Sequence, residues 1–274
     1  LVALDAAGWL ASRPRARRIA RFLYLLLLGL AGLSGTPVPL WLAAPLLVAV
    51  LVHAALGFGE RRNRLHCASA ALALGTMLLA LGHEFPRYAL RPAASAPPAA
   101  LCIIGDSLTA GIGGGIQVYP VLLAQRTGIR VTSLAEPGAT AGTALTAQAP
   151  RLRSVCAAGD WVLVEIGGND MLHGTPPAEF EQALDRLLAE TRRGTPPRPA
   201  LMLELPIIPG RWAYGGIQRR LADKHRVTLI PKRLLAGVIF ETENTLDGIH
   251  LSAKGHRAMV EELAPWLGAT AKQP

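Results

Sequence analysis

Residues 100–230 alternate short apolar runs with longer amphipathic stretches, and this alternation restricts the fold more than any other feature of the chain. The strand-like runs are Ala100–Ile104, Ile129–Leu134, Trp161–Ile166, Ala200–Leu205 and Val227–Ile230. The helix-like stretches between and after them are Tyr119–Thr127, Thr143–Val155, Pro177–Arg193, Trp212–His225 and Ser252–Trp266. Strands that alternate with helices form parallel βαβ units, so the pattern predicts a doubly wound α/β domain over residues 100–270.

The first third of the chain has a different character, because it is dominated by apolar residues. Residues 1–83 contain three mostly apolar stretches, Phe22–Ser34, Leu40–Phe58 and Leu65–Leu81. A spanning helix needs roughly 17–25 such residues, so this region predicts about three transmembrane helices. A cleavable signal peptide is the alternative for the first stretch, since a basic segment precedes a short apolar run. Residues 84–99, which are rich in Pro and Ala, are expected to form a linker.

The positive charge of the chain is unevenly distributed. The net charge is +9, and residues 1–83 contribute +6 of it through eight Arg against two acidic residues. The remaining residues contain no basic run that could track phosphates, which excludes nucleic acid as a partner. Arginines mark the cytoplasmic side of membrane proteins, and here they precede the first stretch and separate the second from the third. We therefore expect a multi-pass protein of the bacterial inner (plasma) membrane with an extracytoplasmic folded domain.

Three short segments, far apart in the chain, combine residue types that carry out chemistry together. They are Gly105-Asp106-Ser107-Leu108-Thr109, Gly167-Gly168-Asn169-Asp170 and Asp247-Gly248-Ile249-His250. Ser107 follows the first predicted strand and Asn169 follows the third. In a doubly wound sheet ligands bind beyond the carboxyl ends of the strands, so we expect both residues at that edge.

Ser107, His250 and Asp247 fit the roles of a catalytic triad. A serine hydroxyl is a weak nucleophile at neutral pH and needs a neighbouring base, for which His250 is the candidate. Asp247, three residues earlier, can fix the tautomer of the imidazole and stabilise its charged form. Taken singly, Ser107 could be a helix N-cap and His250 a surface residue before a helix. Their joint occurrence favours the triad, which needs all three residues.

Acyl transfer also needs hydrogen-bond donors directed at the developing oxyanion. Three donors can be named: the backbone N–H of Ser107, the backbone N–H of Gly138 and the side-chain amide of Asn169. The alternative for Gly138 is an ordinary turn glycine after Pro137. Asn169 could likewise be a turn residue that tolerates a left-handed conformation.

With Gly138 included, these segments resemble the four sequence blocks of the SGNH (GDSL) hydrolase family. They are most similar to its bacterial thioesterase I/lysophospholipase subgroup, over roughly residues 100–267. The resemblance implies a flavodoxin-like three-layer α/β/α sandwich with a parallel five-stranded sheet. It also implies Ser107, Asp247 and His250 as the triad, an oxyanion hole formed by Ser107, Gly138 and Asn169, and neither a metal nor an organic cofactor. One departure is Ser133, where many relatives open the second block with Asn.

The sequence therefore predicts a membrane-anchored serine hydrolase that cleaves carboxylic or thio esters through an acyl-serine intermediate. The expected substrate is a lipid ester, a lysophospholipid or an acylated glycan near the membrane. Two alternatives stay open. The same triad could serve an O-acyltransferase or deacetylase of an envelope polysaccharide, or the domain could be a non-catalytic binding module.

Two further groups of residues have uncertain roles. Apolar residues that could line an acyl pocket, or simply pack in loops, are Met171, Leu172, Ile207, Ile208, Trp212 and Tyr214. Cys102 and Cys156 could form a disulfide in an oxidising compartment, or could both be buried free thiols.

Overall fold

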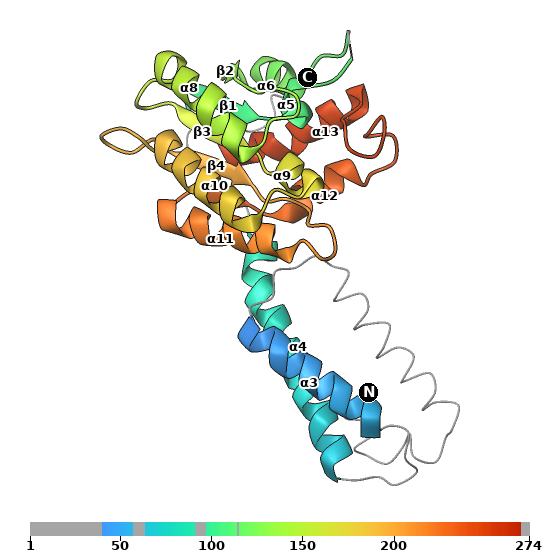
Figure 1. Cartoon of the computed structure of the whole chain (residues 1–274). Coiled ribbons are helices and arrows are strands. Elements are labelled where there is room, and N and C mark those ends of the chain that lie inside the picture. Colours follow the sequence, from blue (N-terminus) through green and yellow to red (C-terminus); the bar gives the residue numbers. More distant parts are fainter. Residues whose placement is uncertain (1–39, 57–63, 91–96, 114, 270–274) are drawn as a thin grey trace. The chain divides into compact units, whose positions relative to one another are not determined.

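The computed structural model describes residues 40–56, 64–90, 97–113 and 115–269 (Figure 1). The chain divides into two compact units, Leu1–Ala89 and Leu90–Pro274.

Two helices form the described part of the first unit. They are α3 (Leu40–Leu56) and α4 (Arg64–Ala89), which pack against each other and cover the second and third apolar stretches. The stretch Phe22–Ser34 lies outside the described residues. Of the helices in the described ranges, none is both long enough and apolar enough to cross a membrane. The linker expected from residue 84 begins later, because α4 continues to Ala89 through Pro86, which removes a single backbone donor without ending the helix.

The second unit is built on a five-stranded parallel sheet, as the sequence predicts. The strands are β1 (Ala100–Gly105), β2 (Arg130–Ser133), β3 (Trp161–Glu165), β4 (Ala200–Leu203) and β5 (Thr228–Ile230). Their order across the sheet is β2-β1-β3-β4-β5, and every neighbouring pair is parallel. This is the flavodoxin-like order, in which the winding direction reverses between β1 and β3. The strand ends at this reversal are where the doubly wound fold places a ligand site.

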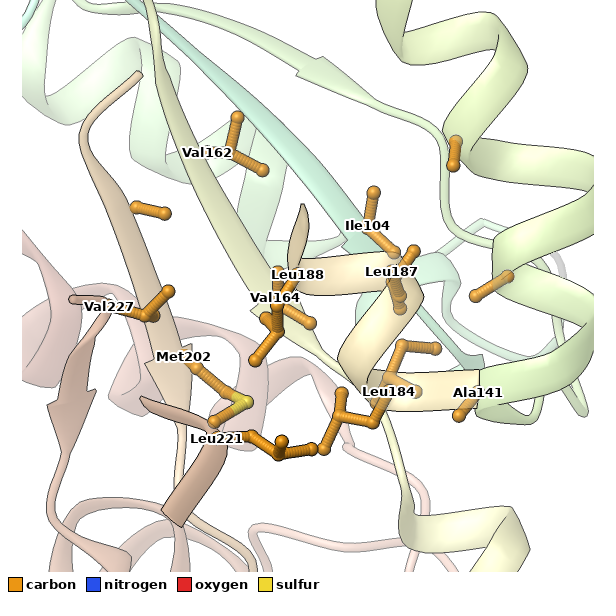
Figure 2. Close-up of a cluster of buried hydrophobic side chains, with 14 of the residues drawn as sticks. Ile104, Ala141, Val162, Val164, Leu184, Leu187, Leu188, Met202, Leu221 and Val227 are labelled. Atoms are coloured by element: carbon orange, nitrogen blue, oxygen red, sulfur yellow. The ribbon is translucent and has the colours of Figure 1, made fainter. Parts of the chain in front are cut away.

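Side chains alternate between the two faces of the sheet, and each face has its own core. Cys102 and Ile104 of β1 point to one face, and Leu101 and Ile103 point to the other. The first face is covered by α8 (Ala149–Val155), α10 (Pro177–Thr191) and α11 (Trp212–His225), and Figure 2 shows part of its core. The second is covered by α6 (Tyr119–Thr127), α12 (Lys232–Ile239), α13 (Ala253–Leu263) and the short η2 (Ala264–Leu267). The architecture is therefore an α/β/α sandwich.

The predicted helix over Thr143–Val155 is divided into three pieces. A short α7 (Ala141–Thr143) leads into a π-helical turn, η1 (Ala144–Gln148), before α8 begins. Pro150 stands at the start of α8 and has no N–H to donate, so the wider turn precedes it. Ala149 N–H closes that turn by donating to the carbonyl of Ala144, five residues back. Single π turns of this kind often occur at functional sites.

Candidate active site

Ser107 lies where β1 ends, at the first position of the four-residue helix α5 (Ser107–Ala110). It is 7% exposed. Asp106 caps this helix, because its Oδ1 accepts a hydrogen bond from the N–H of Leu108 (2.9 Å). The alternative of Ser107 as an N-cap is wrong, since Asp106 holds that position. The side chain of Ser107 is therefore not needed to start the helix.

Gln148 fixes the end of β1 immediately before Ser107. Its Oε1 accepts from the N–H of Gly105 (3.0 Å), and its Nε2 donates to the carbonyl of the same residue (2.9 Å). The Gln148 side chain is fully buried. It thus satisfies the N–H of Gly105 and shares the Gly105 carbonyl with the backbone N–H of Glu136 (3.2 Å). Sequence reasoning missed Gln148, and a glutamine within a helical stretch carries no signal of such a role.

Glu165 supports the same turn from the neighbouring strand. It ends β3 in register with Gly105, and its Oε2 accepts from the N–H of Asp106 (3.3 Å) and from the hydroxyl of Thr109 (2.9 Å). Burial, and then the charge of Asp106, raise the pKa of Glu165 well above its usual range. Burial likewise raises the pKa of Asp106. An acidic residue in an otherwise apolar buried strand was the signal by which the sequence could have indicated Glu165.

Gly138 and Asn169 lie beside the Asp106–Ser107 turn. Gly138 has a φ of +75°, and the N–H of Ala139 closes the turn around it by donating to the carbonyl of Glu136 (3.1 Å). Asn169 belongs to α9 (Gly168–His173), which begins directly after β3. Its Nδ2 donates to Oδ2 of Asp106 (3.1 Å) and to the carbonyl of Ala139 (3.0 Å). Asn169 therefore connects the ends of β1 and β3 with the Gly138 turn.

Asp170 holds the next segment in place. Its buried carboxylate accepts from the N–H of Ala141 (2.8 Å), which ties α9 to the segment that follows the Gly138 turn. Burial raises the pKa of Asp170. Asp106 thus accepts from Leu108 and Asn169, and Asp170 from Ala141, so both carboxyls join neighbouring segments of the site.

Asp247 and His250 form a pair on the loop before α13. His250 Nδ1 lies 2.7 Å from Asp247 Oδ2, while Oδ1 accepts from the backbone N–H groups of Ile249 (3.0 Å) and His250 (2.8 Å). Led by the backbone donor of His250, these bonds lower the pKa of Asp247 to about 2. The side chains are 50% exposed for Asp247 and 26% for His250. The carboxylate therefore stays ionised beside the ring.

The His250 ring interacts electrostatically with the turn that carries Ser107. The imidazole lies close enough to Asp106 for its charge to lower the pKa of that carboxyl. Within the described residues, no hydrogen bond joins the ring of His250 to the hydroxyl of Ser107. The structure thus brings Asp106 together with Asn169 and the Gly138 turn, and places His250 within electrostatic range of Asp106.

The six apolar residues considered for a pocket divide into two groups. Met171, Ile207 and Tyr214 are buried in the core of the first face, so they do not line a surface. Leu172, Ile208 and Trp212 are exposed. The first turn of α11 packs against the segment that follows α9, because Tyr214 donates its hydroxyl proton to the carbonyl of Thr175. Leu172 belongs to α9, Ile208 to the loop after β4 and Trp212 to the start of α11. The exposed group therefore lies on segments that follow β3 and β4 at the carboxyl edge of the sheet.

Cys102 and Cys156 are free and buried in this structure. Their sulfur atoms and a carboxylate oxygen of Asp160 lie within 4.8 Å of one another. Cys102 is in the middle of β1 and Asp160 directly precedes β3, so this group lies away from the strand ends that carry Ser107 and Asn169.

The fold and the candidate site define a class of protein, the doubly wound α/β proteins with a serine at the carboxyl end of the first strand. Residues 103–258 match the GDSL-like Lipase/Acylhydrolase family, and the chain belongs to that family. The similarity to SGNH (GDSL) hydrolases expected from the sequence is thereby confirmed.

The chain is similar in sequence to a curated bacterial protein and in fold to solved structures. Thioesterase 1/protease 1/lysophospholipase L1 of Escherichia coli (strain K12) is 32% identical over 144 residues, which are 48% of this chain and 65% of that protein. The crystal structure of TesA has a TM-score of 0.54 and 26% identity, covering 61% of this chain and 97% of that one. The esterase EstA from Pseudoalteromonas sp. has a TM-score of 0.52 and 21% identity, with 60% and 94% covered, and its likeness concerns the fold.

Proposed function

We propose that the chain hydrolyses carboxylic or thio esters with Ser107 as nucleophile, His250 as general base and Asp247 as the residue that orients the imidazole. The observation that carries this proposal is the 2.7 Å contact between His250 Nδ1 and Asp247 Oδ2. An ionised carboxylate at that nitrogen favours the tautomer with the proton on Nδ1, which leaves Nε2 free to accept a proton.

The proposed reaction gives each of these groups one role. The Ser107 oxygen attacks the acyl carbonyl as its proton passes to His250 Nε2, and the same proton goes to the leaving alcohol or thiol. Water then cleaves the acyl-serine with His250 again as base. The imidazole is partly exposed, so solvent can reach it for this second step.

The oxyanion hole is proposed to combine the N–H groups of Ser107 and Gly138 with the amide of Asn169. In the described part of the chain the two backbone N–H groups have no hydrogen-bond acceptor, which leaves them available to a substrate oxygen. Asn169 differs, because Asp106 and Ala139 already accept from its Nδ2. A substrate oxygen must therefore share or replace one of these two bonds.

The acyl group is proposed to contact the exposed apolar side chains of Leu172, Ile208 and Trp212. They lie at the sheet edge where the site is, and burying apolar surface favours binding of a hydrocarbon chain. Esters or thioesters of fatty acids, including lysophospholipids, are the substrate class that this surface suits.

The decisive test replaces Ser107 with Ala and measures hydrolysis of p-nitrophenyl acetate, butyrate and octanoate. We expect loss of hydrolysis of all three esters, with octanoate the best substrate of the unaltered chain. Ser154→Ala is the matched control, because Ser154 is an exposed serine of α8 that bonds only the carbonyl of Arg151. Equal activity of the Ser107→Ala variant and the control would exclude this nucleophile.

The acyl acceptor can be tested with the same enzyme. We propose water, and supplying an oligosaccharide of an envelope polysaccharide together with the ester should leave the free acid as the main product. Predominant acylation of the glycan would instead assign the O-acyltransferase alternative to the same serine.

We also propose that residues 1–83 anchor the enzyme to the bacterial inner membrane with the hydrolase unit outside the cytoplasm. The support is the sequence pattern of apolar stretches and flanking arginines. The test is to express the full chain in a bacterium, extract the membranes at alkaline pH and treat spheroplasts with protease. We expect retention in the membrane pellet and cleavage of the hydrolase unit. Recovery in the soluble fraction would contradict anchoring, and protection from protease would contradict the orientation.

A further inference from the structure

Glu165 bonds one residue on each side of the nucleophile, Asp106 and Thr109, and is itself buried. Asp106 N–H and the Thr109 hydroxyl both donate to Oε2, so a single carboxyl oxygen holds the chain before and after Ser107. The Thr109 hydroxyl in turn lies 2.7 Å from the hydroxyl of Tyr119. Since Thr109 gives its proton to Glu165, Tyr119 must be the donor to Thr109. All four residues are buried.

The two oxygens of the Glu165 carboxyl therefore have different environments. Oε2 accepts two hydrogen bonds, whereas Oε1 is buried and has no partner among the residues that the structure describes. An ionised carboxylate would leave a charged oxygen unsatisfied in the interior, next to the second carboxylate of Asp106. A neutral carboxyl avoids that cost, with Oε2 as its carbonyl oxygen and the proton on Oε1.

We propose that Glu165 is a positioning residue that acts as a neutral acid, holding the Asp106–Ser107 turn in place through the acceptor Oε2 while Oε1 carries the proton. The neighbouring Asp106 is the anionic group. Because Glu165 is neutral, the Asp106 carboxylate accepts from Leu108 and Asn169 without repulsion from a second negative charge. This inference rests on the proposed function of Ser107. It assigns no contact between Glu165 and the substrate.

The test compares Glu165→Gln with Glu165→Leu. Glutamine is always neutral and offers the same carbonyl acceptor beside an N–H donor, so its kcat/KM should stay within about threefold of the unaltered chain. Its pH–rate profile should also be unchanged. Leucine removes the Oε2 acceptor and with it both hydrogen bonds, so we expect kcat to fall about 10²-fold through misplacement of Ser107, with little change in KM. The Tm should fall as well.

The outcomes separate this inference from the proposed function. An unaltered chain without ester hydrolysis would overturn the function, whereas an active chain in which Glu165→Gln is as impaired as Glu165→Leu would overturn the neutral role. If the leucine variant does not fold, the glutamine variant decides alone. A shifted pH–rate profile or a large loss of kcat in Glu165→Gln would show that the negative charge is required.

A second inference concerns the thiols of Cys102 and Cys156, which lie away from this site. Both are buried, and their sulfur atoms belong to a group that spans no more than 4.8 Å. The carboxylate of Asp160 already accepts from the N–H of Ala157 (2.8 Å) and faces Arg130 (3.7 Å). Arg198 bonds the carbonyl of Cys156 (3.2 Å). Two cations at the group disfavour a bound metal ion, but they do not oppose a bond between the thiols.

We propose that Cys102 and Cys156 form a disulfide under oxidising conditions. With oxidised glutathione as the oxidant, the Cys156 thiolate attacks one sulfur of its disulfide and releases one glutathione thiolate. The Cys102 thiolate then attacks the Cys156 sulfur and releases the second glutathione. The two cysteines lose two electrons and two protons, and glutathione disulfide gains them. The Cys156 pKa is lowered and the Cys102 pKa is raised, with the shared thiol hydrogen bond as the first cause of both shifts. Cys156 is thus the better first nucleophile.

The experiment incubates a Cys67→Ser variant, which keeps only these two cysteines, with oxidised glutathione. After alkylation, peptide mass spectrometry should show residues 102 and 156 joined, and Tm should rise by about 5–10 °C because the bond closes a long loop. Cys156→Ser in the same background is the control and should show no rise. Two separate glutathione adducts, two unreacted thiols, or protection by one equivalent of Zn²⁺ would each overturn the proposal.

Discussion

The two halves of the candidate site are held in different ways. The turn that carries Ser107 is buried and fixed by residues far away in the chain, since Gln148 is 43 residues from Gly105 and Glu165 is 59 from Asp106. The Asp247–His250 pair is partly exposed, and its bonds span at most three residues. The nucleophile is therefore positioned by the folded core, and the imidazole by its own loop.

Because the two halves are held differently, substitutions in them should affect stability and activity differently. Substitutions around Ser107 should affect both the free energy of unfolding and turnover, because they remove buried hydrogen bonds. Substitutions in the exposed pair should affect turnover alone. The predictions below test this contrast.

The largest expected effect is on activity without a change in stability. Replacing His250 with Ala removes the base, and kcat should fall by ~10⁴-fold. The Tm should change by no more than about 2 °C, because the ring is on an exposed loop and bonds only its own neighbour. Ester hydrolysis and differential scanning fluorimetry on the same sample measure both quantities. A large loss of Tm would show that the loop is part of the stabilising core.

Asn169→Ala should have a smaller effect on turnover, but it should also destabilise the protein. Losing one oxyanion donor typically lowers kcat by about 10²–10³-fold. Removing the amide also frees the Asp106 carboxylate and the Ala139 carbonyl, so the Gly138 turn loses a connection to β1. We expect a reduced urea midpoint together with the reduced kcat. A normal kcat would restrict Asn169 to a structural role.

Gln148 and Gln218 offer a matched pair for the next comparison. Gln218 is equally buried and bonds the Leu205 N–H and the Leu203 carbonyl at the end of β4, much as Gln148 bonds both groups of Gly105. Replacing either with Leu removes two buried hydrogen bonds and leaves the freed N–H unsatisfied, although the Gly105 carbonyl keeps the N–H of Glu136 (3.2 Å) as a donor. We expect a cost of about 1–3 kcal/mol of unfolding free energy in each variant. Only Gln148→Leu should also lower kcat, by about tenfold, because a small displacement of a reacting group reduces the rate.

Equal losses of kcat in the two glutamine variants would contradict a specific role of Gln148 in positioning Ser107. Activity would then depend on the stability of the sheet in general, rather than on the end of β1. Urea titrations followed by tryptophan fluorescence give the free energies, and assays at a temperature far below Tm give the rates.

The sequence predicts the sheet and the local half of the site better than the buried half. Alternating apolar runs locate all five strands, and a spacing of three residues lets the Asp247 carboxylate meet its own ring. In contrast, α12 was not predicted, because eight residues directly after β5 give too short a periodic pattern. Gln148 could not be predicted either, since its role arises only when the π turn brings it against β1.

The last prediction concerns pH and compares two histidines six residues apart in the chain. His256 is buried in α13 and accepts the N–H of Tyr119 at Nδ1 (3.2 Å), and burial lowers its pKa to about 4. The unfolded chain, with a pKa near 6.5, binds a proton first. The contribution of the neutral His256 ring to the unfolding free energy is therefore fully present above about pH 6.5. It is lost as the pH falls towards 4, which lowers the unfolding free energy by up to roughly 3 kcal/mol.

His256→Asn should remove this pH dependence, because Asn offers a neutral acceptor that does not titrate in that range. Buried carboxyls with raised pKa values act in the opposite direction, so the measured quantity is the difference between the two proteins in unfolding free energy at pH 7.5 and pH 4.5. His250→Asn is the control. It should leave the change in unfolding free energy between pH 7.5 and pH 4.5 as in the unaltered chain, because the His250 ring is partly exposed and bonds only a residue of its own loop. If the unfolding free energy of the unaltered chain and of His256→Asn changed equally with pH, the protein interior around His256 would tolerate a charged imidazole.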